Sequence, residues 1–125
     1  MKVERQAFEA MVREVLDRMP GHYRRDIENV AFLVQDMPDA ALMKEQRLKD
    51  RNSLLGIYQG VPHAQRLPTA YTASPPDRII LFQSAHETAA SSLEELKSLV
   101  RDTVLHEVGH YFGLSEKEIR KALGE

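Results

Sequence analysis

The sequence predicts a single α+β domain, in which a small mixed sheet of about three strands packs against an N-terminal helix and one long C-terminal helix. A chain of 125 residues is long enough to bury one hydrophobic core and too short for two. Its 42% hydrophobic and 29% charged residues are ordinary for a globular protein. Three short apolar runs with the composition of strands lie between two clear helical patterns.

The N-terminal part of the chain begins with a helix and continues into a strand. Residues 4–18 carry apolar side chains at helical spacing, and Pro20 and Gly21 stop the pattern. These apolar positions are Phe8, Met11, Val12, Val15 and Leu16. The β-branched and aromatic run that follows predicts a strand over Glu28–Val34. The charged residues 40–51 predict either a short helix or an exposed excursion.

Two further strands are expected on either side of a proline-rich segment. Residues 53–60 predict the second strand, in which Gly56 is typical of a close backbone approach or a bulge. Residues 61–77 contain four prolines and have no clear period, which is typical of a functional or disordered loop. Residues 78–83 predict the third strand. This run is apolar throughout, as expected for a strand with both faces covered, and should be interior.

The longest element should be a helix of roughly twenty residues near the C-terminus. Two registers of a capping box are possible at its start, Ser91 with Glu94 or Ser92 with Glu95. Gly113 stands where a left-handed residue would end this helix. The expected apolar side of the helix consists of Leu93, Leu96, Leu99, Val100, Val104 and Val108.

Composition narrows the classes of function. A formal net charge of −2 and a pI near 6.2 give no electrostatic footprint for nucleic acid or an anionic membrane. Because the chain has no cysteine, any metal site must use nitrogen and oxygen ligands. The charged N-terminus lacks the apolar core of a signal peptide, and no apolar run is long enough to span a bilayer. We therefore expect a cytoplasmic protein, while the oligomeric state stays open.

The predicted C-terminal helix carries the motif H-E-x-x-H. His106 and His110 lie one turn apart on the same face, so their imidazoles can converge on one zinc ion at about 2.0–2.1 Å. Glu107 is rotated away from the ligand axis, so its carboxylate can act as the general base on a metal-bound water. The motif therefore predicts one Zn²⁺ per chain and a catalytic Glu107. The alternative is a polar helix face that happens to spell the motif.

A tetrahedral catalytic zinc site needs a third protein ligand, and Glu116 is the candidate that the spacing favours. Glu116 occupies the place of the third histidine in H-E-x-x-H-x-x-G-x-x-H. The alternative is that Glu116 binds no metal and only lies in the first turn of a final helix, where the helix dipole favours an acidic residue. This helix is expected over Ser115–Leu123 with Ser115 as its N-cap. Glu118 is the second choice as a ligand.

Other polar side chains are weaker candidates. Surface positions or local hydrogen bonds are the expected environment of three histidines, His22, His63 and His86. Asp102 lies one turn before His106 and could orient it, although a solvated carboxylate fits Asp102 better. Tyr58 and Tyr71 could donate to an oxyanion, and packing is the simpler interpretation of both.

The chain resembles the small bacterial zincin-like metallopeptidase family, described as a minimal metzincin-type domain. The resemblance lies in LLGIYQGVP (54–62), DRIILF (77–82) and above all HEVGHYFGLSE (106–116). It implies an α+β zincin-like domain with a metal-dependent protease activity. By this resemblance the metal ligands are His106, His110 and Glu116, and the base is Glu107.

Three features depart from the pattern of that family. The third-ligand position, Glu116 here, is more often aspartate. Tyr111 stands where another histidine is common, and no methionine follows Gly113 to form a Met-turn.

The function that the sequence predicts is a zinc-dependent hydrolase, in the first place a peptidase acting on a peptide or protein. Another metal-dependent hydrolase, such as a nuclease, is disfavoured by Glu107, by the acid at 116 and by the lack of a basic patch. A non-catalytic metal-binding or protein-interaction module on the same scaffold is the other alternative.

A peptide substrate must be held extended, and a free sheet edge offers main-chain hydrogen bonds for that purpose. Of the three predicted strands, the one at 53–60 fits an edge because its composition is mixed. We therefore expect residues 61–77 to form the rim of the cleft and residues 54–59 to bind substrate, namely Leu54, Leu55, Gly56, Ile57, Tyr58 and Gln59.

Overall fold

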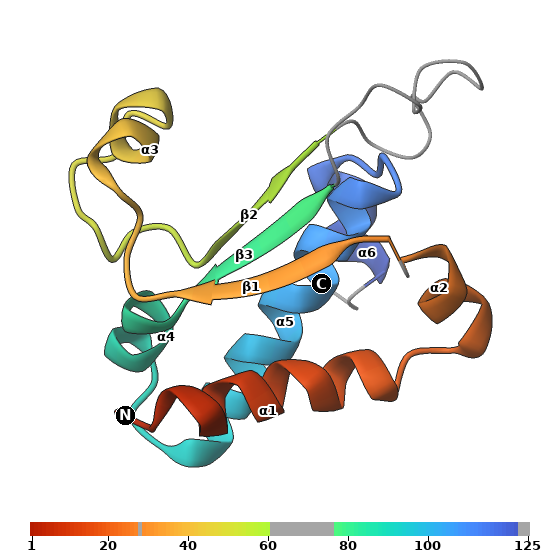
Figure 1. Cartoon of the computed structure of the whole chain (residues 1–125), viewed down its shortest axis with the longest axis horizontal. Helices are drawn as coiled ribbons and strands as arrows, with labels where there is room; N and C mark the ends of the chain where they lie inside the picture. Colours follow the sequence, from red (N-terminus) through yellow and green to blue (C-terminus); the bar gives the residue numbers. More distant parts are fainter. Residues whose placement is uncertain (28, 61–76, 123–125) are drawn as a thin grey trace.

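A three-stranded sheet lies against two long helices in the computed structural model, which describes residues 1–27, 29–60 and 77–122 (Figure 1). The predicted α+β fold with a small mixed sheet is confirmed. Along the chain the elements are α1 (Arg5–Asp17), α2 (Gly21–Asp26), β1 (Ala31–Gln35), α3 (Ala40–Glu45), β2 (Gly56–Gln59), β3 (Arg78–Phe82), α4 (Gln83–Ala89), α5 (Leu93–Tyr111) and α6 (Glu116–Ala122). None of these helices is long and apolar enough to cross a membrane.

The sheet has the strand order β1-β3-β2, so β3 is central and the other two strands are edges. β1 runs parallel to β3, and β2 runs antiparallel to it. Residues 79–82 of β3 are all buried, which explains the continuous apolar run. The prediction of an interior third strand and of an edge at the second strand is therefore confirmed.

Each face of the sheet has its own apolar cluster. On one face, Ile79 and Leu81 of β3 pack with α1 and α5, and Phe8 is fully buried between these elements. On the other face, Ile80 and Phe82 pack with Leu42 of α3 and with the residues that precede β2. Because successive residues of a strand point to opposite faces, the alternation along β3 places both clusters.

The caps of α5 and α6 follow the expected chemistry in most details. The Ser92 hydroxyl accepts a hydrogen bond from the backbone N–H of Glu95 at 3.1 Å, so Ser92 is the N-cap of α5. The Glu95 carboxylate bonds the N–H of Ser91, one residue beyond the capping-box position. In α6, Ser115 and Glu118 form a complete capping box, with the two bonds at 3.2 and 3.1 Å.

Several predicted boundaries were wrong. The first strand begins at Ala31 and ends at Gln35, because the backbone before it forms α2 and a turn. The second begins only at Gly56. The third ends at Phe82, because Gln83 already starts α4. Leu93, expected on the apolar side of α5, is 42% exposed at the first helical position.

The helices α2 and α4 were not predicted, because each is a single short segment without an apolar period. α3 resolves the ambiguity of residues 40–51: it is a helix of six residues with Asp39 as its N-cap. The expected rim at residues 61–77 lies outside the described residues except for Asp77, which is buried directly before β3.

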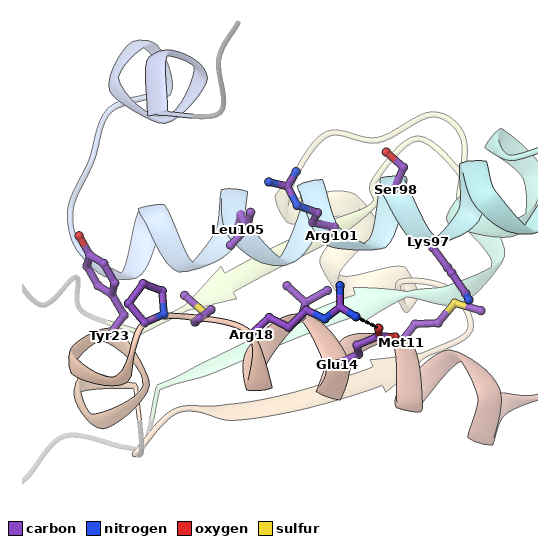
Figure 2. A pocket seen from close by; sticks show the side chains of 11 residues that line it. Met11, Glu14, Arg18, Tyr23, Lys97, Ser98, Arg101 and Leu105 are labelled. Atoms are coloured by element: carbon purple, nitrogen blue, oxygen red, sulfur yellow. Dashed lines mark ion pairs between the residues drawn. The ribbon is translucent and has the colours of Figure 1, made fainter.

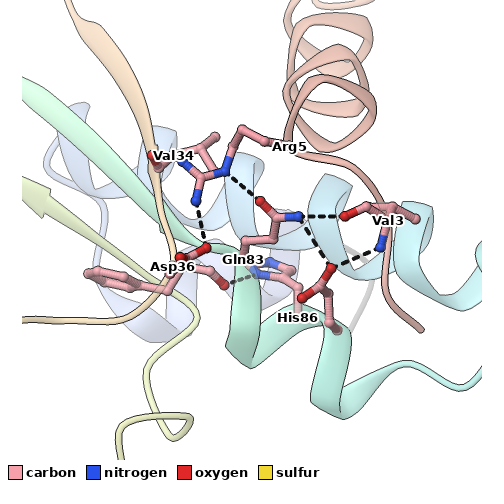
Figure 3. Close-up of polar contacts among 8 residues, drawn as sticks. Val3, Arg5, Val34, Asp36, Gln83 and His86 are labelled. Atoms are coloured by element: carbon pink, nitrogen blue, oxygen red, sulfur yellow. Dashed lines mark hydrogen bonds and ion pairs between the residues drawn. The ribbon is translucent and has the colours of Figure 1, made fainter.

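The outer edge of β1 is held by α1 through Arg5 (Figure 3). The Arg5 guanidinium donates to the Val34 carbonyl at 3.1 Å and to the Asp36 carboxylate at 2.6 Å. Its Nε donates to Gln83 at 2.6 Å, and Gln83 in turn donates to the Val3 carbonyl at 3.0 Å. α1, β1 and α4 are thereby joined around one side chain.

Candidate metal centre

The last two turns of α5 present two imidazoles on one side of the helix. The rings of His106 and His110 are 4.8 Å apart between centroids, and their planes meet at 78°. Both side chains are 31% exposed, so they are half-buried at the surface of α5. Residues four apart on a helix face the same way, and this geometry follows directly from the motif spacing.

Glu116, the first residue of α6, meets both histidines. Its Oε1 lies 3.0 Å from the Nε2 of His106 and 3.0 Å from the Nε2 of His110. Desolvation alone would raise the pKa of the Glu116 carboxyl, but the two imidazoles outweigh it and hold the pKa below its usual value. The sequence-predicted ligands His106, His110 and Glu116 are therefore brought to one point by two helices.

The turn between α5 and α6 makes this meeting possible. Gly113 adopts a φ of 78°, which a side chain would strain. Its N–H donates to the carbonyl of His110, and the N–H of Leu114 donates to the carbonyl of Gly109. This is the Schellman pattern, and it confirms the expected left-handed end of the helix.

A glycine inside the motif, Gly109, lets α6 pack closely on α5, a role that the motif pattern did not predict. A Cβ built on Gly109 would lie 2.7 Å from the Cγ1 of Ile119, and Ile119 is only 2% exposed. This close approach lets α6 pack against the turn of α5 that contains the H-E-x-x-H motif. Glu116, the first residue of α6, is thereby placed near the two histidines. The signal available in the sequence was a glycine in the middle of an otherwise regular helix, which usually has a packing reason.

Glu107 points to a different environment, beneath the sheet edge. It is 7% exposed, and this burial raises the pKa of its carboxyl. His110 and a hydrogen bond from the backbone of Tyr58 in β2 act in the opposite direction on the same pKa. The Glu107 carboxylate is therefore held between α5 and β2.

β2 and α5 approach closely at Gly56, as the glycine within the predicted strand indicated. A Cβ at Gly56 would lie 2.9 Å from the Cγ2 of Thr103, 3.1 Å from the carbonyl of Ile80 and 3.5 Å from the Cγ of Glu107. Any larger residue would push the edge strand away from the helix that carries the histidines.

Thr103 is itself held by a buried histidine. His86 is fully buried, its Nδ1 lies 2.8 Å from the Phe82 carbonyl, and its Nε2 lies 2.9 Å from the Thr103 hydroxyl. Burial lowers the pKa of the His86 imidazole, which favours the neutral ring. The expectation of a local hydrogen-bonding role for His86 is met, but the role is in the interior.

A cleft of about 590 Å³ opens beside the three converging side chains, between β2 and the α5–α6 turn. Of the residues predicted to bind substrate, Leu54, Gly56, Ile57 and Tyr58 line this cleft. Leu55 lines an adjoining hollow of about 310 Å³ that also reaches Arg120 of α6. Gln59 is not among the lining residues, because its side-chain oxygen accepts a hydrogen bond from Arg78 at 2.6 Å.

The remaining candidates are engaged in other contacts, although Asp102 lines the adjoining hollow. Glu118 is engaged in the cap of α6, and Asp102 pairs with Arg101 at 3.1 Å. Tyr111 turns away from the histidines, because its hydroxyl donates to the Asp26 carbonyl at 2.9 Å. Three of the earlier candidates, namely His63, Tyr71 and the side chain of His22, lie outside the described residues.

The donor set fits zinc. Donor atoms on one tetrahedral zinc, each bound at about 2.0–2.1 Å, lie about 3.3 Å from one another. The two separations of 3.0 Å at Glu116 need only a small expansion to match. Glu107 also has ligand atoms within 4.8 Å of both histidines, but Tyr58 holds its carboxylate beneath β2.

A model of the zincin-like metallopeptidase family matches residues 27–124. The chain belongs to the zincin-like metallopeptidases. The matched segment covers everything from β1 through α6, so both the sheet edge and the histidine motif lie within it, and the expected family is confirmed.

Other comparisons concern the fold of this zincin-like metallopeptidase. It is similar to the structure of a conserved hypothetical protein from Thermo thermophilus, with a TM-score of 0.56 and 20% sequence identity. The similarity covers 88% of this chain and 94% of that chain, and at this identity it concerns the fold alone. No curated protein sequence matches the chain significantly.

Proposed function

We propose that the chain is a zinc-dependent peptidase that binds one zinc ion through His106, His110 and Glu116. The observation that supports this most directly is the single carboxylate oxygen placed 3.0 Å from both imidazole nitrogens. Nitrogen and oxygen donors of this kind suit zinc, and three protein ligands leave a position open for chemistry.

Glu107 is the general base in this proposal. A zinc ion held by the three side chains would act as a Lewis acid and lower the pKa of water towards about 7. Glu107 takes the proton from the attacking water and passes it to the leaving amine. Its burial keeps bulk water from competing for the carboxylate, and the Tyr58 backbone keeps it oriented.

The outer edge of β2, which pairs with no strand other than β3 among the described residues, is the part of the site that suits an extended peptide. The Phe82 N–H donates to the Leu55 carbonyl, and this fixes which backbone groups of β2 face the neighbouring strand. By the same alternation, the backbone groups of Gly56 and Tyr58 face the outer edge, where the Tyr58 backbone donates to Glu107. A substrate backbone can pair with the groups of Gly56 there, beside the cleft that contains the histidines.

The variant Glu107→Gln tests the proposal. It keeps the shape of the side chain and removes the proton acceptor, so zinc content should stay at one per chain while peptide hydrolysis falls by about 10²–10⁴-fold. Zinc content is measured by elemental analysis of protein purified without added metal, and hydrolysis by digestion of a peptide library.

Two results would contradict the proposal. Hydrolysis that survives in Glu107→Gln would show that another group is the base. A wild-type protein that carries zinc and cleaves no library peptide would instead indicate a non-catalytic module.

A further inference from the structure

A second hollow lies between α1 and α5, away from the histidines (Figure 2). It has a volume of about 580 Å³. Its floor is apolar and consists mainly of Met11, Val15 and Met19 from the N-terminal part and Leu105 from α5. Tyr23 stands at one end, where it is 41% exposed and packs edge-on against the ring of Phe112. We call this hollow the α1–α5 groove.

The rim of the α1–α5 groove is positively charged. Arg18, Lys97 and Arg101 line it, with Glu14 as the single acidic residue among them, so the rim carries three positive charges and one negative charge. The whole chain has a net charge of −2, and the groove therefore has the opposite sign to the molecule. Charge complementarity at such a surface selects an acidic partner.

The ion pairs at this rim are easily exchanged. Arg18 pairs with Glu14 at 2.9 Å, and these side chains are 79% and 51% exposed. Arg101 pairs with its neighbour Asp102 at 3.1 Å, also at the surface. Exposed pairs of this kind contribute only about 0–1 kcal/mol, so carboxylates of a partner can replace them at little cost.

The α1–α5 groove lies on the opposite side of α5 from the metal centre. With about 100° per residue, Lys97, Arg101 and Leu105 fall roughly half a turn of the helix away from His106 and His110. None of the residues that line the groove lines the cleft at the metal centre. A partner can therefore occupy the groove while the cleft stays open.

We infer that the α1–α5 groove is a docking site for an acidic amphipathic helix of a partner protein. The stretch from Lys97 to Leu105 is about 12 Å long, which matches two turns of a bound helix. Methionine side chains adapt to varied apolar partners, and tyrosine and arginine are enriched in interfaces. A second copy docked groove to groove is disfavoured, because it would bring two positively charged rims together.

The experiment uses the full chain and a synthetic helical peptide of about 15 residues. The peptide carries leucines at i, i+4 and i+7 with glutamates beside them, and a twin has every glutamate replaced by lysine. Binding is measured by fluorescence anisotropy and mapped by amide chemical shifts. The acidic peptide should bind at least about tenfold tighter than its twin, with shifts in residues 11–23 and 97–105.

Charge-reversal variants provide the matched comparison. The double variant Lys97→Glu with Arg101→Glu should lower the affinity for the acidic peptide by about tenfold or more. Arg13→Glu with Lys49→Glu makes the same change in net charge at exposed residues outside the groove and should leave binding within about twofold.

The inference is overturned by equal binding of the two peptides, by shifts that map outside the groove, or by equal effects of both double variants. It is also overturned if decanoate, tested in the same way as a small amphiphilic ligand, occupies the groove and the peptide does not. Concentration-dependent dimerisation that Lys97→Glu with Arg101→Glu abolishes would identify a second copy as the occupant and would also overturn it. Since zinc content and peptide cleavage do not enter this test, its failure is distinct from failure of the peptidase proposal.

Discussion

The two edges of the sheet are closed in different ways. Along β1, the backbone groups of Phe32 and Val34 face outward, and the Val34 carbonyl accepts a hydrogen bond from Arg5. Along β2, those of Gly56 and Tyr58 face outward, and the Tyr58 backbone donates to the carboxylate of Glu107. One edge is bound to the scaffold, and the other is bound to the proposed catalytic base.

This difference shows how a very small domain can keep one edge available. An exposed edge strand is a template for pairing with other chains, so it has to be covered or used. Arg5 covers the β1 edge with a side chain that has no part in the cleft. β2 is instead kept close to α5 by Gly56, and the cleft that contains the histidines lies alongside it.

The largest effect is expected at the proposed metal ligands, on the β2 side of the sheet. His106→Ala or His110→Ala should weaken zinc binding by more than about a hundredfold, because either change removes one of the three proposed protein ligands. Glu116→Gln should weaken it by a smaller but clear factor. Zinc affinity is measured by competition with a chromophoric chelator.

Glu118→Gln is the matched control for Glu116→Gln. Glutamine can still accept the capping hydrogen bond from Ser115, so α6 should persist and zinc affinity should stay within about twofold. If Glu116→Gln binds zinc as tightly as the wild type, the third ligand has been assigned wrongly.

The next effect concerns the spacing between β2 and α5. Gly56→Ala places a methyl group 2.9 Å from Thr103, which is buried and held by His86, so neither side can give way easily. We expect a loss of about 1–3 kcal/mol in the free energy of unfolding and a fall in peptidase activity, with zinc affinity nearly unchanged. Urea denaturation and chelator competition measure the two quantities.

Gly21→Ala is the control for that variant, because a Cβ there meets nothing within 4 Å. It should be neutral or stabilise the protein slightly. If Gly56→Ala likewise leaves the free energy of unfolding unchanged, the close contact between β2 and α5 does not limit the size of the residue at this position.

A smaller effect should follow from opening the other edge. Arg5→Met removes the bonds to Val34, Asp36 and Gln83, and we expect about 1–2 kcal/mol less stability because the arginine is partly exposed. Zinc affinity should not change. Arg13→Met, an exposed residue of the same helix, should alter stability by less than about 0.5 kcal/mol. A loss of zinc affinity in Arg5→Met would mean that the two edges are not independent.

The sequence predicted the elements whose physical signals are local. The histidines at i and i+4, the glycine that ends α5 and the continuous apolar run of β3 each imply their structure from spacing alone. The N-cap at Ser115 was likewise predicted from the pattern of the sequence.

What the sequence could not supply depends on contacts between distant residues. His86 is buried beside Thr103, seventeen residues away, and nothing in its sequence neighbours marks it as interior. The seating of Ile119 on Gly109 and the bond from Tyr58 to Glu107 arise only once α5 lies against α6 and β2. These contacts set where the proposed base, Glu107, and the proposed third ligand, Glu116, lie.

The smallest expected effect, and the most direct comparison of the two edges, is protection from hydrogen exchange by a bound peptide. A peptide hydroxamate should bind zinc and lay its backbone along β2, so amides in 54–60 and 106–110 should exchange more slowly while those in 31–35 do not change. Acetohydroxamate is the control, because it can bind zinc but has no peptide backbone that could pair with β2. It should slow exchange only at residues 106–110 of α5. Protection in 31–35 with none in 54–60 would place the substrate on the wrong edge for our proposal. Slower exchange along β2 with both compounds would show that zinc binding stiffens the edge without any strand pairing.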